Sequence, residues 1–517
     1  MRIGSAGTAL AAVLTTGLLL TGCGGPGGSA DSPDSAKGKA NQGVTGGGST
    51  ADEPAASVAP DAKGRKENTT PDPNHLSTFA LDVDTASYGY ARRSLQEGRL
   101  PDPISVRPEE FVNSFRQNYP RPEGNGFSVT MDGARMGHDG WRLMRVGLAT
   151  AQAPASGERP PAALTFVVDI SGSMGEPGRL DLVKQSLTTL TGQLGPDDSI
   201  ALVTFSDEAK TVVPMTRLGA RDGTARDRIL EAVDTLEPTD STNLDAGIRT
   251  GYDTAVRGTR DGATNRVVLL SDALANTGRT TADAILERIT DARRDHGITL
   301  FGVGVGSDYG DALMEQLADK GDGHTTYVST PEDARKVFVQ QLPANVELRA
   351  RDAKAQVAFD EKNVTDFRLL GYENRRVADD DFRDDRVDGG EIGPGHTVTA
   401  LYAVKLREGA SGRIAKATVR WLDPDSRAPR EESGTVAASD LDRDLWSDET
   451  ELRLRVDAAA TYFAHSLGDA SKATLPGEPS LTELATLTRQ LADETEDADV
   501  RAMAEAVRQA SALKAAE

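Results

Sequence analysis

Residues 163–174 read ALTFVVDISGSM, a largely apolar run that ends in an aspartate and two serines. The run over residues 164–170 predicts a strand buried on both faces, as in a parallel sheet covered by helices. Asp169, Ser171 and Ser173 alternate at its end, so their side chains can turn toward one point on a tight loop. Carboxylate and hydroxyl oxygens are hard ligands, suited to Mg²⁺ or Mn²⁺. The stretch therefore predicts an α/β fold and a divalent-metal site at a strand end.

Strands and helices alternate after this stretch, which predicts a mostly parallel sheet with helices on both faces over residues 161–342. The expected strands cover residues 200–205, 267–270, 298–305 and 325–328. The expected helices cover residues 180–194, 226–236, 244–256, 282–294, 311–318 and 331–342. The first of these helices has leucines and a valine spaced to fill one face.

Two further segments are expected at the same edge of this sheet. Thr242 precedes a predicted helix, and Asp272 follows the apolar run VVLL. Ligands of open α/β sheets bind in the crevice beyond the carboxyl ends of the strands, so both side chains can join Asp169 there. Any one of these residue types is also common as a helix cap or turn residue. Only the ordered set of five oxygen-bearing side chains indicates a metal site.

The regions on either side have a different pattern. Residues 76–160 predict an N-terminal α+β region, with strands at 77–83, 127–131 and 141–149 and helices at 85–97 and 107–119. Asp84 or Thr85 is expected to cap the first of these helices. Residues 343–515 predict a small antiparallel β unit followed by C-terminal helices, with strands at 346–348, 355–359, 364–372, 397–406 and 414–421. Ser480 and Glu483 form a predicted capping box before one of those helices.

The first 22 residues are typical of an export signal, with Arg2 before a short apolar stretch. Leu20-Thr21-Gly22-Cys23 resembles a bacterial lipobox, in which the cysteine becomes lipidated. The alternative is an ordinary signal peptide with a chance cysteine. Residues 23–75 lack aromatic residues and predict a disordered tether, with a reach of about 40 Å. We therefore expect a chain lipid-anchored to the cell membrane on its extracytoplasmic side.

Composition limits the partners and the chemistry. The formal net charge of −22 argues against nucleic acid, whose phosphates need a basic surface. Cys23 is the only cysteine, so the chain forms no intramolecular disulfide. No general base stands out beside the five oxygen-bearing side chains, and we expect no enzyme activity.

Three segments together resemble the motifs of the von Willebrand factor type A (VWA) domain, which carries a metal-ion-dependent adhesion site. They are FVVDISGSM, DSTNLDAGI and VVLLSDALAN, and the resemblance covers roughly residues 160–342. It implies a Rossmann-like fold in which Ser171, Ser173 and Thr242 are direct or near-direct metal ligands. Asp169 and Asp272 would act directly or through water. Ala273 stands where the family commonly has glycine, a small change behind the metal.

The flanking segments FALDVDTASY and RPEEFVNSF, with the C-terminal region, resemble companion regions of bacterial VWA lipoproteins. The role of that C-terminal region is unknown in the group. The resemblance implies a cell-surface lipoprotein that binds a protein or cell-wall partner through its metal site, with a carboxylate of the partner completing the metal shell. The alternative is a scaffold or assembly factor for an envelope complex, in which the metal site is mainly structural.

Overall fold

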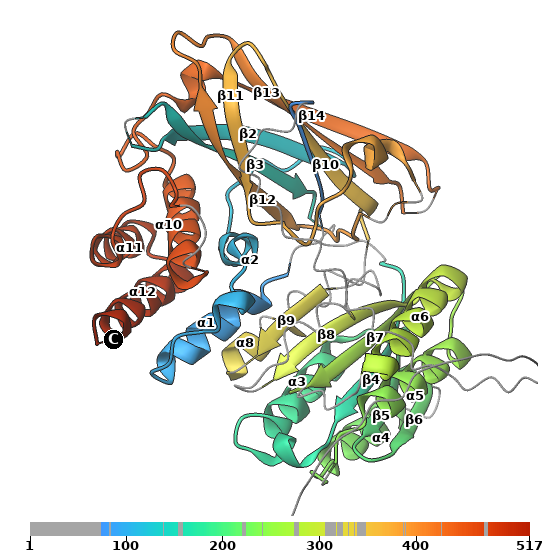
Figure 1. Cartoon of the computed structure of the whole chain (residues 1–517). Helices are drawn as coiled ribbons and strands as arrows, with labels where there is room; N and C mark the ends of the chain where they lie inside the picture. Colours follow the sequence, from blue (N-terminus) through green and yellow to red (C-terminus); the bar gives the residue numbers. More distant parts are fainter. Residues whose placement is uncertain are drawn as a thin grey trace, which may run out of the picture. The chain divides into compact units, whose positions relative to one another are not determined.

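Figure 1 shows a computed structural model of the chain. The structure describes residues 74–81, 84–137, 139–152, 159–219, 224–239, 241–272, 279–305, 317, 324–328, 330–335, 337–338, 348–385, 387, 389–424, 426–469 and 474–516. The predicted export signal, Cys23 and nearly all of the predicted tether lie outside these residues. Within them, no helix is long and apolar enough to cross a membrane.

The predicted α/β region folds around a six-stranded sheet with the order β6-β5-β4-β7-β8-β9. Its strands are β4 (Ala162–Asp169), β5 (Ser199–Phe205), β6 (Ala209–Arg217), β7 (Thr264–Ser271), β8 (Thr299–Val305) and β9 (His324–Val328). All neighbours pair in parallel except β6, which is antiparallel to β5. The mostly parallel, Rossmann-like sheet confirms the predicted fold class. The edge strand β6 was not predicted.

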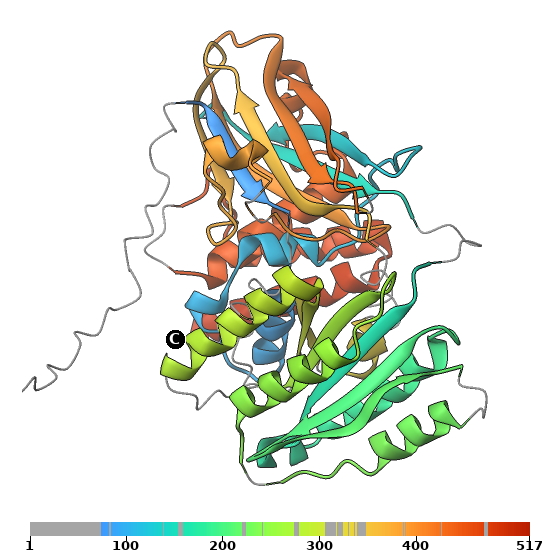
Figure 2. The same ribbon diagram turned by 90° about the vertical axis from the view of Figure 1, so that its right-hand side faces the viewer.

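Helices cover both faces of this sheet, as expected (Figure 2). One face packs against α3 (Leu180–Gln193), α4 (Ala225–Asp234) and α8 (Pro331–Arg335), and the other against α5 (Leu244–Arg257) and α6 (Arg279–His296). Successive residues of β4 serve opposite faces, because side chains alternate along a strand: Phe166 packs in the first core and Val167 in the second. The predicted helix at 311–318 lies, except for residue 317, outside the described residues.

The flanking regions share two four-stranded sheets, with the orders β1-β10-β13-β14 and β11-β12-β3-β2. The strands are β1 (Leu76–Ala80), β2 (Phe127–Arg135), β3 (Trp141–Thr150), β10 (Arg351–Phe359), β11 (Val364–Leu370), β12 (Thr397–Leu406), β13 (Arg413–Leu422) and β14 (Pro429–Ala437). Apolar residues of both sheets form one core between them. Because β1 pairs with β10 and β3 with β12, the two flanking regions are not separate units. The α/β domain is an insertion between β3 and β10 of one β-sandwich.

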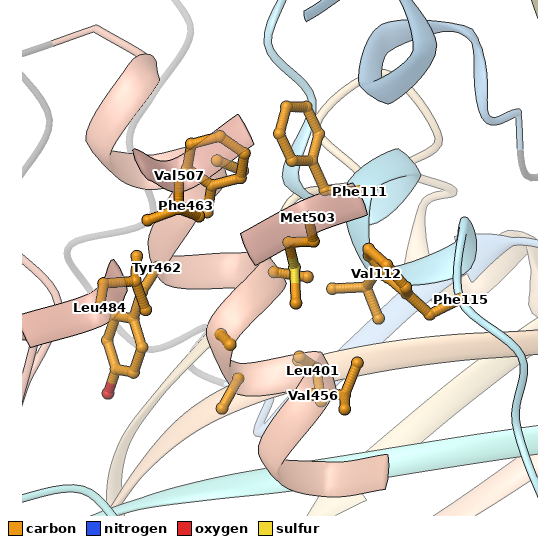
Figure 3. Close-up of a cluster of buried hydrophobic side chains, with 14 of the residues drawn as sticks. Phe111, Val112, Phe115, Leu401, Val456, Tyr462, Phe463, Leu484, Met503 and Val507 are labelled. Carbon is orange, nitrogen blue, oxygen red and sulfur yellow. The ribbon is translucent and has the colours of Figure 1, made fainter. Parts of the chain in front are cut away.

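Five helices share one core with the outer face of the sheet that contains β12, and Figure 3 shows part of this core. They are α1 (Ala86–Gln96), α2 (Pro108–Asn113), α10 (Leu452–Leu467), α11 (Leu481–Thr495) and α12 (Ala498–Ala516). Phe111 of α2 and Phe463 of α10 meet edge to face, with ring centroids 5.8 Å apart, in the core that also contains Leu401 of β12. The capping box of Ser480 and Glu483 starts α11, as predicted.

Two predictions for the N-terminal helices need correction. The second helix ends at Asn113 rather than Tyr119, and the side-chain amide of Asn113 donates to the carbonyl of Thr399 in β12 at 2.9 Å. Thr85, one of the two expected caps, occupies the N-cap position of α1 but makes no side-chain cap hydrogen bond, and Asp84 does not cap the helix. Its carboxylate accepts a hydrogen bond from the backbone N–H of Thr325 in β9 and pairs with Arg375 at 2.7 Å. The residue thus joins the β-sandwich to the edge strand of the inserted domain.

Glu109 of α2 gives the fold a pH dependence. The side chain is buried, and its Oε2 has no hydrogen-bond partner within the described structure. Burial and the nearby Glu373 raise the pKa of Glu109 from 4.5 to about 7. When folding raises the pKa of a carboxyl, the protonated form of that group favours the folded state. This contribution to stability is complete below the pKa of the unfolded state, and it is lost as the pH rises through the pKa of the folded state.

We expect Glu109→Gln to be more stable than wild type at about pH 8, by roughly 3 kcal/mol at most, and to match it near pH 4. The difference should therefore grow as pH rises from about 4.5 to about 7. Thermal melting across that range measures it, with the exposed Glu123→Gln as the control. A constant difference between Glu109→Gln and wild type at every pH would contradict the prediction.

Candidate metal site

Asp169 is the last residue of β4, the strand at which the strand order of the sheet reverses. β4 lies between β5 and β7, and both pair with it in parallel. The chain runs from β4 to β5 on one side of β4, and it later forms β7 on the other side. The loops that follow β4 and β7 therefore diverge at this edge of the sheet. Open α/β sheets bind ligands in such a crevice. The backbone alone therefore brings Asp169 and Asp272 to the same place.

The carboxylate of Asp169 is fully buried and holds the first loop. Its Oδ1 accepts the backbone N–H of Ser171 at 2.8 Å, and its Oδ2 accepts the hydroxyl of Ser271 at 2.6 Å. Burial raises the pKa of Asp169, the bonds from Ser271 and Ser171 oppose that rise, and Asp272 adds to it. A positive charge at this edge would therefore stabilise the ionised form of Asp169.

Ser171 and Ser173 present their hydroxyl groups together. Their Oγ atoms lie 3.2 Å apart, on the loop that continues into a single 3₁₀ turn, Gly172–Gly175. Two neighbouring ligands of an octahedral Mg²⁺ lie about 3.0 Å apart, given bond lengths near 2.1 Å. Ser171 is buried and Ser173 half-buried, so the pair leads from the buried carboxylates to the surface.

Asp272 is 1% exposed and only half satisfied. Its Oδ2 accepts a hydrogen bond from Nη1 of Arg179 at 2.6 Å. Its Oδ1 is buried and has no hydrogen-bond partner among the described residues. A buried carboxylate oxygen without a partner is costly, unless a bound cation or an ordered water completes it. The residues present therefore fit a divalent cation.

Thr242 lies at the same edge but stands apart from the other four residues. Backbone bonds on both sides hold its segment there, from Thr239 N to the carbonyl of Ile170 and from Asn243 N to the carbonyl of Ser206, each at 2.6 Å. Its half-buried hydroxyl forms no hydrogen bond to the other four predicted residues in the described structure. Thr242 therefore takes no part in the hydrogen bonds that link the other residues of the site.

Helix α5, which begins just after Thr242, lies very close to the sheet. Asn243 caps this helix, because its Oδ1 accepts the backbone N–H of Ala246 at 3.1 Å. A β-carbon added to Gly251 would lie 2.3 Å from Cγ2 of Val167 in β4. Small residues at the contact thus fix the distance between the strand that ends in Asp169 and the loop that carries Thr242.

Two residues at the site were missed by sequence reasoning. Ser271 directly precedes Asp272, and its hydroxyl donates to Asp169. Arg179 pairs with Asp272 from the start of α3. The Pro177-Gly178 pair marks a turn in the sequence, which signals a chain reversal there but not the direction of the next side chain.

The five predicted residues bring two carboxylates and three hydroxyls to the site. In the described part of the chain, no group of three or more histidine, cysteine, aspartate or glutamate side chains is arranged to hold a metal. Hydroxyl oxygens are acceptable ligands for a hard cation such as Mg²⁺. The residues that would hold it are Ser171, Ser173 and Thr242, with Asp169 and Asp272 behind them.

Comparison with known proteins identifies the regions of the chain. The profile described as the von Willebrand factor type A domain matches residues 163–341, and that of the C-terminal part of the uncharacterized protein YfbK matches residues 345–437. A third profile, described as von Willebrand factor, matches residues 62–142. The uncharacterized protein YfbK of Escherichia coli is 33% identical over 411 residues, which cover 75% of this chain and 70% of that protein. The chain belongs to the YfbK family of VWA proteins.

Two further matches are more distant. The uncharacterized protein sll0103 of Synechocystis is 30% identical over 210 residues, 40% of this chain and 47% of that protein. The solved structure of a von Willebrand factor type A protein from Catenulispora acidiphila is 14% identical. It covers 74% of this chain and 89% of its own, with a TM-score of 0.47. VWA domains typically mediate protein–protein interaction, and they often bind a metal ion at the adhesion site.

Proposed function

We propose that the VWA domain is the binding module of a non-enzymatic, lipid-anchored protein on the extracytoplasmic side of the cell membrane. It would bind an acidic group of a protein or cell-wall partner through Mg²⁺ or Mn²⁺. The buried Oδ1 of Asp272, which has no hydrogen-bond partner among the described residues, carries the proposal, because a cation held with the hydroxyls of Ser171 and Ser173 would complete it. A carboxylate of the partner suits an open position on such a cation.

The order of burial supports an outward-facing site. Asp169, Ser171 and Asp272 are buried, whereas Ser173 and Thr242 are half-buried. The two carboxylates and Ser171 are thus buried, and the hydroxyls of Ser173 and Thr242 are nearer the solvent. A partner group would approach from the side of Ser173 and Thr242.

Capture of a partner should require both the metal and the serine hydroxyls. The full-length chain, immobilised in detergent, would be exposed to envelope extract in Mg²⁺ or in EDTA. We expect a partner that is retained only in Mg²⁺, and that Ser171→Ala/Ser173→Ala does not retain. Thr188→Ala/Thr189→Ala is the matched control, because these two hydroxyls of α3 donate only to carbonyls of their own helix. Equal retention by wild type and the serine variant would contradict metal-dependent binding.

A scaffold with a mainly structural site is the second candidate. It is favoured by one observation: Arg179 gives Asp272 a charged partner without any metal. In the capture experiment, a partner kept in EDTA by both wild type and the serine variant would support this function.

The lipid anchor has its own test. Wild type should incorporate radiolabelled palmitate and sediment with membranes, whereas Cys23→Ser should do neither, because that thiol is the only one in the chain that could carry a lipid. Wild type that remains unlabelled, or Cys23→Ser that still sediments with membranes, would overturn the anchor without affecting the metal site.

A further inference from the structure

Arg179 brings a fixed positive charge to the metal site. It ends the turn formed by Glu176, Pro177, Gly178 and Arg179, in which the backbone N–H of Arg179 donates to the carbonyl of Glu176 at 3.3 Å. Gly178 has a φ of +82°, and the proline before it is typical of a type II turn. The Arg179 side chain is only 3% exposed. The charge is thus built into the entry of α3 rather than carried on a mobile surface residue.

The guanidinium bridges two of the three loops. Its Nη1 donates to Oδ2 of Asp272 at 2.6 Å and to the backbone carbonyl of Ser173 at 3.1 Å. Its Nη2 pairs with Glu176 at 2.7 Å, and that glutamate is 62% exposed. Arg179 therefore holds the Ser173 loop to the Asp272 loop through direct contacts, and it keeps one exposed carboxylate beside it.

The charges at the site explain why such a bridge matters. Asp169 and Asp272 are both buried, and two buried carboxylates without a counter-charge are strongly unfavourable. Arg179 supplies one positive charge to this pair. The same charge repels a divalent cation and competes with it for Asp272. One side chain can thus stabilise the metal-free loops and weaken metal binding.

We propose that Arg179 is a built-in counter-charge that holds the loops of this site together without metal and lowers the site's affinity for a divalent cation. The proposal rests on the proposed function, since it assumes a metal site at these residues. It deepens that function, because the site would exchange its cation readily and remain folded when empty. Arg179 is a positioning residue here and not a ligand.

The test compares Arg179→Gln with wild type as full-length chains in detergent. Titration calorimetry with Mg²⁺ alone should give a dissociation constant about ten-fold lower for the variant, a usual size for coupling between charges that share a site. In EDTA the variant should melt at a lower temperature than wild type, and Mg²⁺ should raise its melting temperature by more. Arg179→Lys keeps the charge but not the fork of donors, so its affinity should stay close to that of wild type.

Arg159→Gln is the matched control. Arg159 pairs with the buried Asp198 in the same domain, at the opposite end of the sheet. Its loss should lower the melting temperature equally with and without Mg²⁺.

If wild type binds Mg²⁺ and Arg179→Gln binds it equally well or more weakly, this proposal alone is overturned. Failure of every one of these proteins to bind Mg²⁺ overturns the metal site as well. If Arg179→Gln does not fold even in Mg²⁺, the affinity of Arg179→Lys for Mg²⁺ decides. A ten-fold tighter affinity of Arg179→Lys overturns the proposal, and an affinity equal to that of wild type supports it.

Discussion

An Asp169→Asn variant should bind Mg²⁺ about 100-fold more weakly than wild type, the upper end of what loss of a supporting carboxylate costs a metal site. The substitution removes one of the two buried negative charges and keeps the shape of the side chain. The amide oxygen can still accept the backbone N–H of Ser171, and the amide nitrogen can donate to the hydroxyl of Ser271. The fold should therefore survive, and the loss should appear in metal affinity.

Asp198→Asn provides the matched control for this variant. Asp198 is also a buried aspartate of the VWA domain and accepts the backbone N–H groups of Ala162 and Gly195. It lies at the amino-terminal end of the sheet, away from the site, so its variant should lose stability but keep its affinity for Mg²⁺. Titration calorimetry measures the affinity and thermal melting the stability. An Asp169→Asn protein that folds and binds Mg²⁺ as wild type does would show that the cation lies elsewhere.

The fold of the VWA domain could be predicted because its information is local. Each buried strand is a short apolar run, each helix has its own period, and Asp169 and Asp272 follow directly on two of the strands. Two edge strands, β6 and β14, were missed for the same reason. Their residues are largely exposed or half-buried, so they lack the apolar run that marks a central strand.

The β-sandwich could not be predicted, because its pairings join distant parts of the chain. Ala80 of β1 lies opposite Lys354 of β10, and Val146 of β3 lies opposite Ala400 of β12. The residue pattern of a segment does not predict which distant strand it pairs with. The direction of the side chains at the candidate metal site could not be predicted from the sequence either. The sequence placed five oxygen-bearing residues at one sheet edge, but the pairing of Arg179 with Asp272 depends on how a side chain turns back across a loop.

We expect the stability of the β-sandwich and its C-terminal helices to depend more on Arg145 of β3 than on any other residue. Its guanidinium donates to Asp457 of α10 at 2.9 Å, to Asp132 of β2 at 2.6 Å and to Glu451 at 3.0 Å. Asp457 is fully buried, and Gln117 also donates to it at 2.6 Å. The network thus joins the C-terminal helices to the sheet from which the VWA domain departs.

An Arg145→Met variant should lose about 3–5 kcal/mol of folding free energy, because it leaves the buried charge of Asp457 uncompensated. Urea unfolding measures the loss. Arg142→Met is the control on the same strand, since Arg142 pairs with the exposed Asp442 and its loss should cost under about 1 kcal/mol. Adding Asp457→Asn to Arg145→Met should recover part of the loss by removing the unpaired charge. Equal losses for the two arginine variants would mean that packing, and not this network, holds the C-terminal helices on the sheet.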